Sequence, residues 1–153
     1  MRRTTTAGIV LALAFGVLAG AAAYTFQYAK GLSYFSNEPK ACVNCHVMNE
    51  QYDGWLAGSH HGAAVCNDCH MPHALVPKMV TKARNGWNHS KAFTLMNFPE
   101  PIQITVKNKA VLEANCRNCH ADMVSPLTDA HGGFDLERGC THCHLHSGHG
   151  PVR

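Results

Sequence analysis

Four short motifs of one form constrain this chain more than any other feature. Each motif has two cysteines separated by two residues and followed directly by a histidine, at 42–46, 66–70, 116–120 and 140–144. This spacing is typical of covalent c-type haem attachment, in which both thiols bond to the porphyrin and the histidine can bind the iron. The sequence therefore predicts four c-type haems. The attachment residues use all eight cysteines: Cys42, Cys45, Cys66, Cys69, Cys116, Cys119, Cys140 and Cys143.

Structural zinc is the alternative use of paired Cys-x-x-Cys motifs, and the interval between Cys45 and Cys66 would suit a zinc ribbon. Zinc gives no reason, however, for a histidine after every second cysteine. The chain has 12 histidines among 153 residues, so chance rarely places one there four times. Haem attachment is therefore the interpretation that we adopt.

The chain is short, so it can bury only a modest apolar core of its own. Haem is a large, flat, apolar group, and four haems would supply much of the missing core. We expect a mainly α multihaem c-type cytochrome, with one N-terminal transmembrane helix and a small haem-packed periplasmic domain with few or no strands. A formal charge of only +3 argues against nucleic acid as a partner.

The N-terminal segment 4–29 contains no charged residue, and 7–26 is almost wholly apolar or small. At about 1.5 Å per residue, about 20 helical residues cross a hydrocarbon core about 30 Å thick. We predict an uncleaved membrane anchor over 1–29 and a haem domain over 30–153. A cleaved signal peptide, ending at the small residues 21–23, is the alternative.

Two features favour the anchor over the signal peptide. The apolar run is longer than a usual signal h-region, and Tyr24, Tyr28 and Tyr34 follow it as an interfacial belt would. Arg2 and Arg3 would then stay in the cytoplasm, which places the haem domain on the periplasmic side of a bacterial inner membrane. The first motif would lie close to the lipid headgroups.

Hydrophobic periodicity predicts a short helical piece within 50–62, a long helix over 75–95 and another over 105–120. Prolines within 93–104 predict an irregular connection, and Gly132 with Gly133 predicts a loop before the fourth motif. One side of the 75–95 helix is apolar. The other side carries a polar stripe, which alone is typical of a solvated face: Lys78, Lys82, Asn85 and His89.

Four irons offer up to eight axial positions. The motif histidines can fill four of them: His46, His70, His120 and His144. Eight further histidines remain: His60, His61, His73, His89, His131, His142, His146 and His149. Two histidines per iron would suit electron transfer, whereas an open position would allow a small molecule to bind. Composition alone does not assign the pairs.

Beyond the motifs, the chain resembles the NapC/NirT family of tetrahaem quinol dehydrogenases, and within it the small membrane-anchored subunits of cytochrome c nitrite reductases. The likeness begins with the apolar N-terminus, the segment 41–49 with Met48 after the first motif, and the second motif. It continues with the run 82–94 and with His144 followed by His149 and Gly150. It covers nearly the whole chain.

The resemblance implies a set of axial ligands. Haem 1 would take Met48 rather than His46, with its other face forming part of a quinol site. Haem 2 would pair His70 with His149. Haem 3 would pair His120 with an upstream histidine, either His60 or His61. Haem 4 would have His144, and its second ligand would be a lysine lent by the catalytic subunit of a reductase.

The resemblance also implies a function. Lys82 matches a family lysine at the quinol pocket, and His89 falls where some members carry an aspartate. Histidine suits proton exchange because its pKa is about 6.5. We expect an electron-transfer subunit with quinol dehydrogenase activity, which oxidises menaquinol and passes electrons to a periplasmic multihaem nitrite reductase that makes ammonium. The alternatives are a quinol-oxidising donor to another periplasmic reductase, and a soluble periplasmic electron shuttle.

Overall fold

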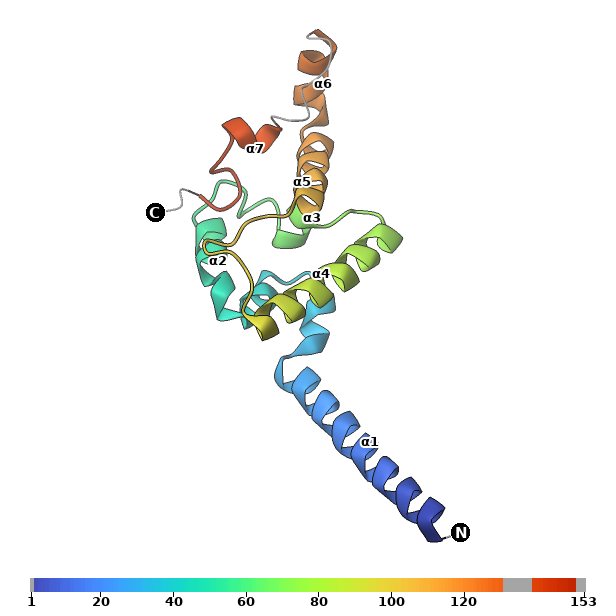
Figure 1. The fold of residues 1–153 in the computed structure, drawn as a ribbon. Helices are drawn as coiled ribbons and strands as arrows, with labels where there is room; N and C mark the ends of the chain where they lie inside the picture. Colours follow the sequence, from blue (N-terminus) through green and yellow to red (C-terminus); the bar gives the residue numbers. More distant parts are fainter. Residues whose placement is uncertain (1, 131–138, 151–153) are drawn as a thin grey trace. The chain divides into compact units, whose positions relative to one another are not determined.

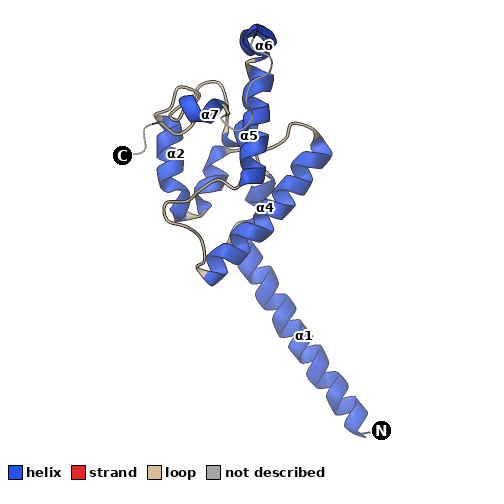
Figure 2. Ribbon diagram, turned by 45° about the horizontal axis from the view of Figure 1, so that its top comes forward, coloured by secondary structure: helices blue, strands red, loops and turns tan. Residues whose placement is uncertain are grey.

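The computed structural model describes residues 2–130 and 139–150 (Figures 1 and 2). All regular structure in these ranges is helical, and no strand occurs in them, so the predicted mainly α fold is confirmed. The chain divides into two compact units, Met1–Ser36 and Asn37–Arg153. The predicted loop at Gly132 and Gly133 lies outside the described residues.

The first unit consists of α1 (Arg2–Tyr28) and a 3-10 turn, η1 (Gly31–Phe35). Within α1, Thr5–Tyr28 has a mean hydropathy of 2.1, and its side chains are exposed. The helix ends where Lys30 adopts the left-handed conformation, with φ of 51°. An apolar helix of this length that no other part of its unit covers is consistent with the predicted membrane anchor.

The second unit contains the remaining helices, and their bounds are η2 (Pro39–Asn44), η3 (His46–Met48), α2 (Asn49–Leu56), α3 (Cys66–His70), α4 (Leu75–Leu95), α5 (Val106–Cys119), α6 (Ala121–Ala130) and α7 (Cys140–Cys143). The helix predicted over 75–95 is confirmed at both ends by α4. The irregular connection is shorter than predicted, because α4 continues through Leu95 and ends where Met96 takes φ of 50°. Helix α5 begins at the residue after Thr105, whose hydroxyl accepts a hydrogen bond from the amide of Asn108.

The interior of the second unit is polar. No hydrophobic side chain among the described residues is buried, and the buried polar and charged residues are Thr81, Lys82, Asn85, Glu113 and Asn115. A domain stabilised by its own side chains would bury apolar ones. The described protein therefore lacks an apolar core of its own, as expected if the cofactor supplies it.

The interpretation of the α4 polar stripe as a solvated face is wrong for two of its members. Lys82 is 2% exposed and Asn85 is 5% exposed. Both face the interior of the unit, where Asn85 Oδ1 accepts a hydrogen bond from Asn108 Nδ2 on α5 (3.3 Å). The polar side of α4 is thus its packed side.

Candidate haem-binding site

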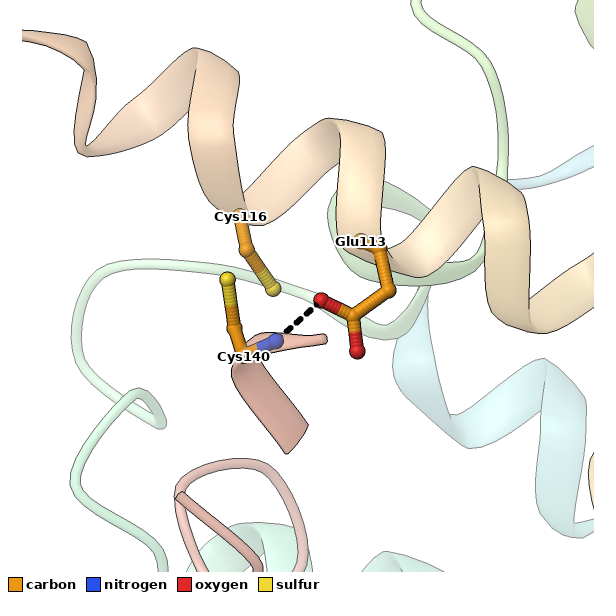
Figure 3. Close-up of side chains that lie close together, drawn as sticks. All are labelled: Glu113, Cys116 and Cys140. Carbon is orange, nitrogen blue, oxygen red and sulfur yellow. Dashed lines mark hydrogen bonds between the residues drawn. The ribbon is translucent and has the colours of Figure 1, made fainter. Parts of the chain in front are cut away.

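The four cysteine motifs lie in a row that follows their order in the chain. Cys42 of the first motif is hydrogen-bonded through its side chain to Cys66 of the second. Cys69 of the second motif lies close enough to Cys116 of the third to help raise the pKa of the Cys116 thiol. Cys116 in turn lies beside Cys140 of the fourth motif, as Figure 3 shows. Groups attached at these cysteines would form a continuous series from the first motif to the fourth.

Asn115 connects the second motif to the third. This residue of α5 is buried, and its Nδ2 atom donates to the main-chain carbonyls of Cys69 and Met71, both at 2.9 Å. A side-chain amide has two N–H groups, so both donors are satisfied. The residue directly before Cys116 therefore holds the end of α3 against α5.

Glu113 connects the third motif to the fourth. One carboxylate oxygen accepts from the amide of Cys140 (2.6 Å), and the other accepts from the amide (3.1 Å) and the hydroxyl (2.6 Å) of Thr141. Burial alone would raise the pKa of Glu113, but these hydrogen bonds outweigh it and hold the pKa below its ordinary value. The carboxylate thus fixes the start of α7 on the side of α5.

Gly139 makes this approach possible. Its φ of 62° lies in the left-handed region, and a Cβ atom there would lie 2.6 Å from Glu113 Oε1. Any other residue would be strained and would push the carboxylate away. The contact between Glu113 and the start of α7 is therefore possible only with a glycine directly before the fourth motif.

Glu113, Cys116 and Cys140 place three potential metal-ligand atoms within 4.8 Å of one another (Figure 3). The two thiols belong to different haem-attachment motifs, and the carboxylate already accepts hydrogen bonds from α7. This cluster is therefore a structural junction between two motifs and not a metal site.

The rings of His70 and His149 lie close together, at the separation that a pair of axial ligands would have. Their ring centres are 5.9 Å apart and their planes differ by 33°. A metal–imidazole bond is about 2 Å long and the ring centre lies about 1 Å further back, so rings on opposite sides of one metal have centres about 6 Å apart. His149 Nδ1 donates to the carbonyl of Gln51 (2.8 Å), which leaves Nε2 for the metal.

A second pair is formed by His60 and His120, with ring centres 6.0 Å apart and planes at 82°. His60 Nδ1 donates to the carbonyl of Ser147 (2.8 Å), which again leaves Nε2 for a metal. His61 lies elsewhere, with its exposed ring packed edge-on against Trp55 (5.0 Å). The structure thus brings His60, and not His61, opposite His120.

The segment 147–150 determines the orientation of both pairs because it lies along α2. The main chain of Gly54 on α2 contacts the carbonyl of His149 so closely that a Cβ atom would overlap it. Gly150 takes φ of 65°, and Ser59 Oγ donates to the carbonyl of Ser147 (3.4 Å). Two histidine pairs whose ring separations suit a shared iron, and a polar interior without an apolar core, together fit bound haem.

The first motif differs from the others. His46 is exposed and Met48 is half-buried, both in η3. Lys82 on α4 lies close enough to Cys42 for their side chains to interact electrostatically. Burial lowers the pKa of Lys82, and the neighbouring Lys78 lowers it further. His89 lies seven residues further along the same helix and is exposed.

His144 follows α7 and is exposed, and no second histidine ring pairs with it among the described residues. His73 Nε2 and His146 Nδ1 make only local contacts, with the carbonyls of Asp68 and Gly150, both at 3.3 Å. His131 lies outside the described residues. The residues that sequence reasoning missed are those that hold the motifs together: Gln51, Gly54, Glu113, Asn115, Gly139 and Ser147.

Comparison with known proteins points in the same direction. Residues 2–151 match the NapC/NirT cytochrome c family, N-terminal region. The chain is 41% identical to the cytochrome c-type protein NrfH of Wolinella succinogenes, covering 95% of this chain and 85% of that protein. It is 32% identical to the cytochrome c nitrite reductase subunit NrfH of Nitratidesulfovibrio vulgaris, covering 79% and 72%.

One solved structure is also similar, the crystal structure of a cytochrome c nitrite reductase NrfHA complex bound to the HQNO inhibitor. Its matching chain is 28% identical, with a TM-score of 0.65, over 90% of this chain and 92% of that one. The likeness therefore extends over the anchor and the motif-bearing unit alike.

Proposed function

The chain belongs to the NapC/NirT cytochrome c family and carries c-type haem, and from this premise we propose that it is a membrane-anchored tetrahaem cytochrome that oxidises menaquinol and delivers the electrons to a periplasmic multihaem nitrite reductase. The observation that carries the proposal is the likeness to two NrfH proteins and to a chain of the NrfHA complex over most of the length. Four complete attachment motifs support the number of haems.

Bound c-type haem supplies one-electron oxidation and reduction, which divides the two-electron oxidation of a quinol into single steps. This chain's own residues position the four groups. His70 with His149 and His120 with His60 are the proposed axial pairs of the second and third haems, and their geometry favours His60 over His61. Two histidine ligands on each iron would close it to small molecules and would suit electron transfer.

The ends of the row have the less complete ligand sets. Met48, with His46 as the alternative, is the proposed ligand at the first motif. His144 is the proposed ligand at the fourth, where its exposed position leaves room for a lysine lent by the reductase. Electrons would enter at the first motif, which follows the anchor in the chain, and leave at the fourth motif, where the partner would bind.

The quinol site is proposed beside the first motif, at Lys82 and His89. Because burial lowers the pKa of Lys82, its amine releases a proton more readily than an ordinary lysine, and it can exchange one with a quinol hydroxyl. His89 is exposed on the same helix and can pass a proton to water. With Arg2 and Arg3 in the cytoplasm, the protons would leave on the periplasmic side.

The experiment uses the full-length, haem-loaded chain in proteoliposomes with a menaquinol analogue, and records haem reduction with and without purified nitrite reductase. We expect rapid haem reduction by the quinol, and ammonium formation only when nitrite and the reductase are both present. A chain that is reduced by quinol but transfers no electrons to the nitrite reductase would instead be a donor to another reductase. A chain that washes off the membrane would be a soluble shuttle.

The proposed site residues are tested in the same assay with Lys82→Leu and His89→Leu. Each variant should slow quinol-dependent haem reduction while chemical reduction by dithionite stays complete. Asn88→Leu, which changes an exposed polar residue on the same helix, is the matched control. Unchanged quinol rates in both Lys82→Leu and His89→Leu would remove these residues from the mechanism.

A further inference from the structure

Helix α4 has its polar and apolar sides reversed with respect to an ordinary surface helix. Its buried residues are Thr81, Lys82 and Asn85, whereas Val76 is 71% exposed, Val80 60% and Trp87 70%. A surface helix normally packs its apolar stripe against the core and exposes its polar face. The apolar side of α4 therefore needs a separate explanation.

The exposed apolar side chains point away from the interior of the unit. At about 100° per residue, Val76, Val80, Ala83 and Trp87 lie within an arc of about 60°. The centre of this arc is about 180° from that of the buried residues 81, 82 and 85. Cys42, the attachment cysteine that interacts with α4, lies beside Lys82 on the buried side of the helix, so a haem bonded there would meet that side and not the apolar arc.

Basic residues border the arc. Arg84 and Lys91 are exposed, and both fall beside Val80 on the helical wheel. Next to them lies a shallow pocket lined by Trp87, Ser90, Lys91, Thr94 and Leu95. Aliphatic residues and a tryptophan bordered by arginine and lysine are typical of a helix that lies in the plane of a membrane, where long basic side chains reach anionic headgroups.

The length of the connection to α1 favours the membrane as the surface that covers the apolar arc of α4. The apolar helix ends at Tyr28, and the second unit begins at Asn37. Nine residues span at most about 32 Å even when fully extended, which is about the thickness of a bilayer core. However the two units are arranged, the lipid surface therefore stays within reach of the second unit. A soluble protein or a second copy has no such tether.

We propose that α4 is an interfacial helix whose apolar arc, at Val76, Val80, Ala83 and Trp87, inserts into the lipid headgroup region. This contact would dock the haem unit on the bilayer in one orientation and hold Lys82 about one helix diameter, about 10 Å, from the lipid. The inference rests on the anchor and on the exposure of α4. It does not depend on the chemistry at Lys82, so it goes beyond the proposed function.

The test uses the full-length holoprotein in nanodiscs that hold one copy each and contain phosphatidylethanolamine and phosphatidylglycerol. All eight native cysteines are bonded to haem, so an introduced cysteine is the only free thiol. Val80→Cys lies in the arc. Asn88→Cys is the matched control, because Asn88 is exposed on the same helix but outside the arc. Haem content and the optical spectrum confirm that each variant is assembled.

A charged, membrane-impermeant maleimide should label Val80→Cys on the order of tenfold more slowly than Asn88→Cys, after each rate is divided by that of the denatured protein. A phospholipid with a photoreactive group at the start of its acyl chain should form adducts on peptides of α4 and none on peptides of α5. The double variant Val80→Asp with Trp87→Ser should lose these adducts while it keeps its haem spectrum.

Equal labelling of the two cysteines in nanodiscs that contain this chain alone would overturn the proposal. Labelling of Val80→Cys that slows only after the reductase is added would also overturn it, because the arc would then be a protein-docking surface. Lipid adducts that persist in the double variant would show that the arc does not determine the contact. Loss of quinol activity with the labelling difference intact would contradict the proposed function only.

Discussion

The ring of His149 donates a hydrogen bond from Nδ1 to the main-chain carbonyl of Gln51, 2.8 Å away and 98 residues earlier in the chain. A carbonyl can only accept, so this contact fixes the tautomer and leaves Nε2 of His149 to bind a metal. The carbonyl of Ser147 does the same for His60. One segment of four residues therefore orients a histidine of each of two pairs.

Replacement of Gly54 should disturb this arrangement. In Gly54→Ala the new methyl group would overlap the carbonyl of His149 and displace the C-terminal segment from α2. We expect His149 to leave its iron, so that one of the haems becomes high-spin and binds carbon monoxide. Magnetic circular dichroism and carbon monoxide titration measure both changes.

The matched control for Gly54→Ala is Gly62→Ala. A Cβ atom at Gly62 meets no atom within 4 Å, so this variant should keep the wild-type spectrum. A fully low-spin spectrum in Gly54→Ala would show that the segment 147–150 does not hold His149 in place.

His60 and His61 should respond differently to substitution, although they are adjacent. His60→Ala removes the ring opposite His120, so we expect one haem to lose an axial ligand and its reduction potential to shift. His61→Ala removes only an edge contact with Trp55, and the haem spectra should not change. Spectroelectrochemical titration of both variants separates the two assignments. The opposite pattern would make His61 the ligand.

The sequence was sufficient for the features that depend on short-range chemistry. The attachment motifs have a fixed spacing, and the periodicity of residues 75–95 matches α4 at both ends. The sequence did not predict which side of α4 packs against the rest of its unit. Lys82 and Asn85 have the side chains of surface residues, and only the structure shows an interior without apolar side chains in which they are buried. Contacts between distant residues, such as Glu113 with Cys140, leave no periodic signal. A glycine before the fourth motif was the only local hint of that contact.

Glu113 should make stability depend on pH. Its pKa in the folded protein is held below the ordinary 4.5, so the unfolded chain binds more protons in that range. The carboxylate therefore contributes stability that is fully present above pH 4.5 and is lost as the pH falls through the folded pKa. Glu113→Gln should lower the free energy of unfolding at pH 7 by roughly 1–3 kcal/mol. The difference from the native chain should shrink below pH 4.5.

Guanidinium unfolding of the haem-loaded chain at several pH values measures this difference. Histidine ligands are also lost in acid, but they are lost equally in both proteins. Their effect on the free energy of unfolding therefore cancels when the two proteins are compared. Glu100→Gln, an exposed glutamate between α4 and α5, is the matched control and should have no effect. A difference between Glu113→Gln and the native chain that stays constant down to pH 3 would show that the carboxylate acts without its charge.

The second unit should not fold without its haems. None of its described hydrophobic side chains is buried, so the apolar burial that normally drives folding, about 25 cal/mol for each Å², is missing from the protein alone. We expect a chain with all eight cysteines replaced by alanine to show no cooperative thermal transition. Because α1 can remain helical in lipid, total helix content does not report whether the second unit is folded. Hydrogen exchange of peptides from α2, α4 and α5 is specific, and it should be fast in the alanine variant and slow in the haem-loaded chain. Protected amides in those helices of the variant would show that side-chain contacts alone specify this fold.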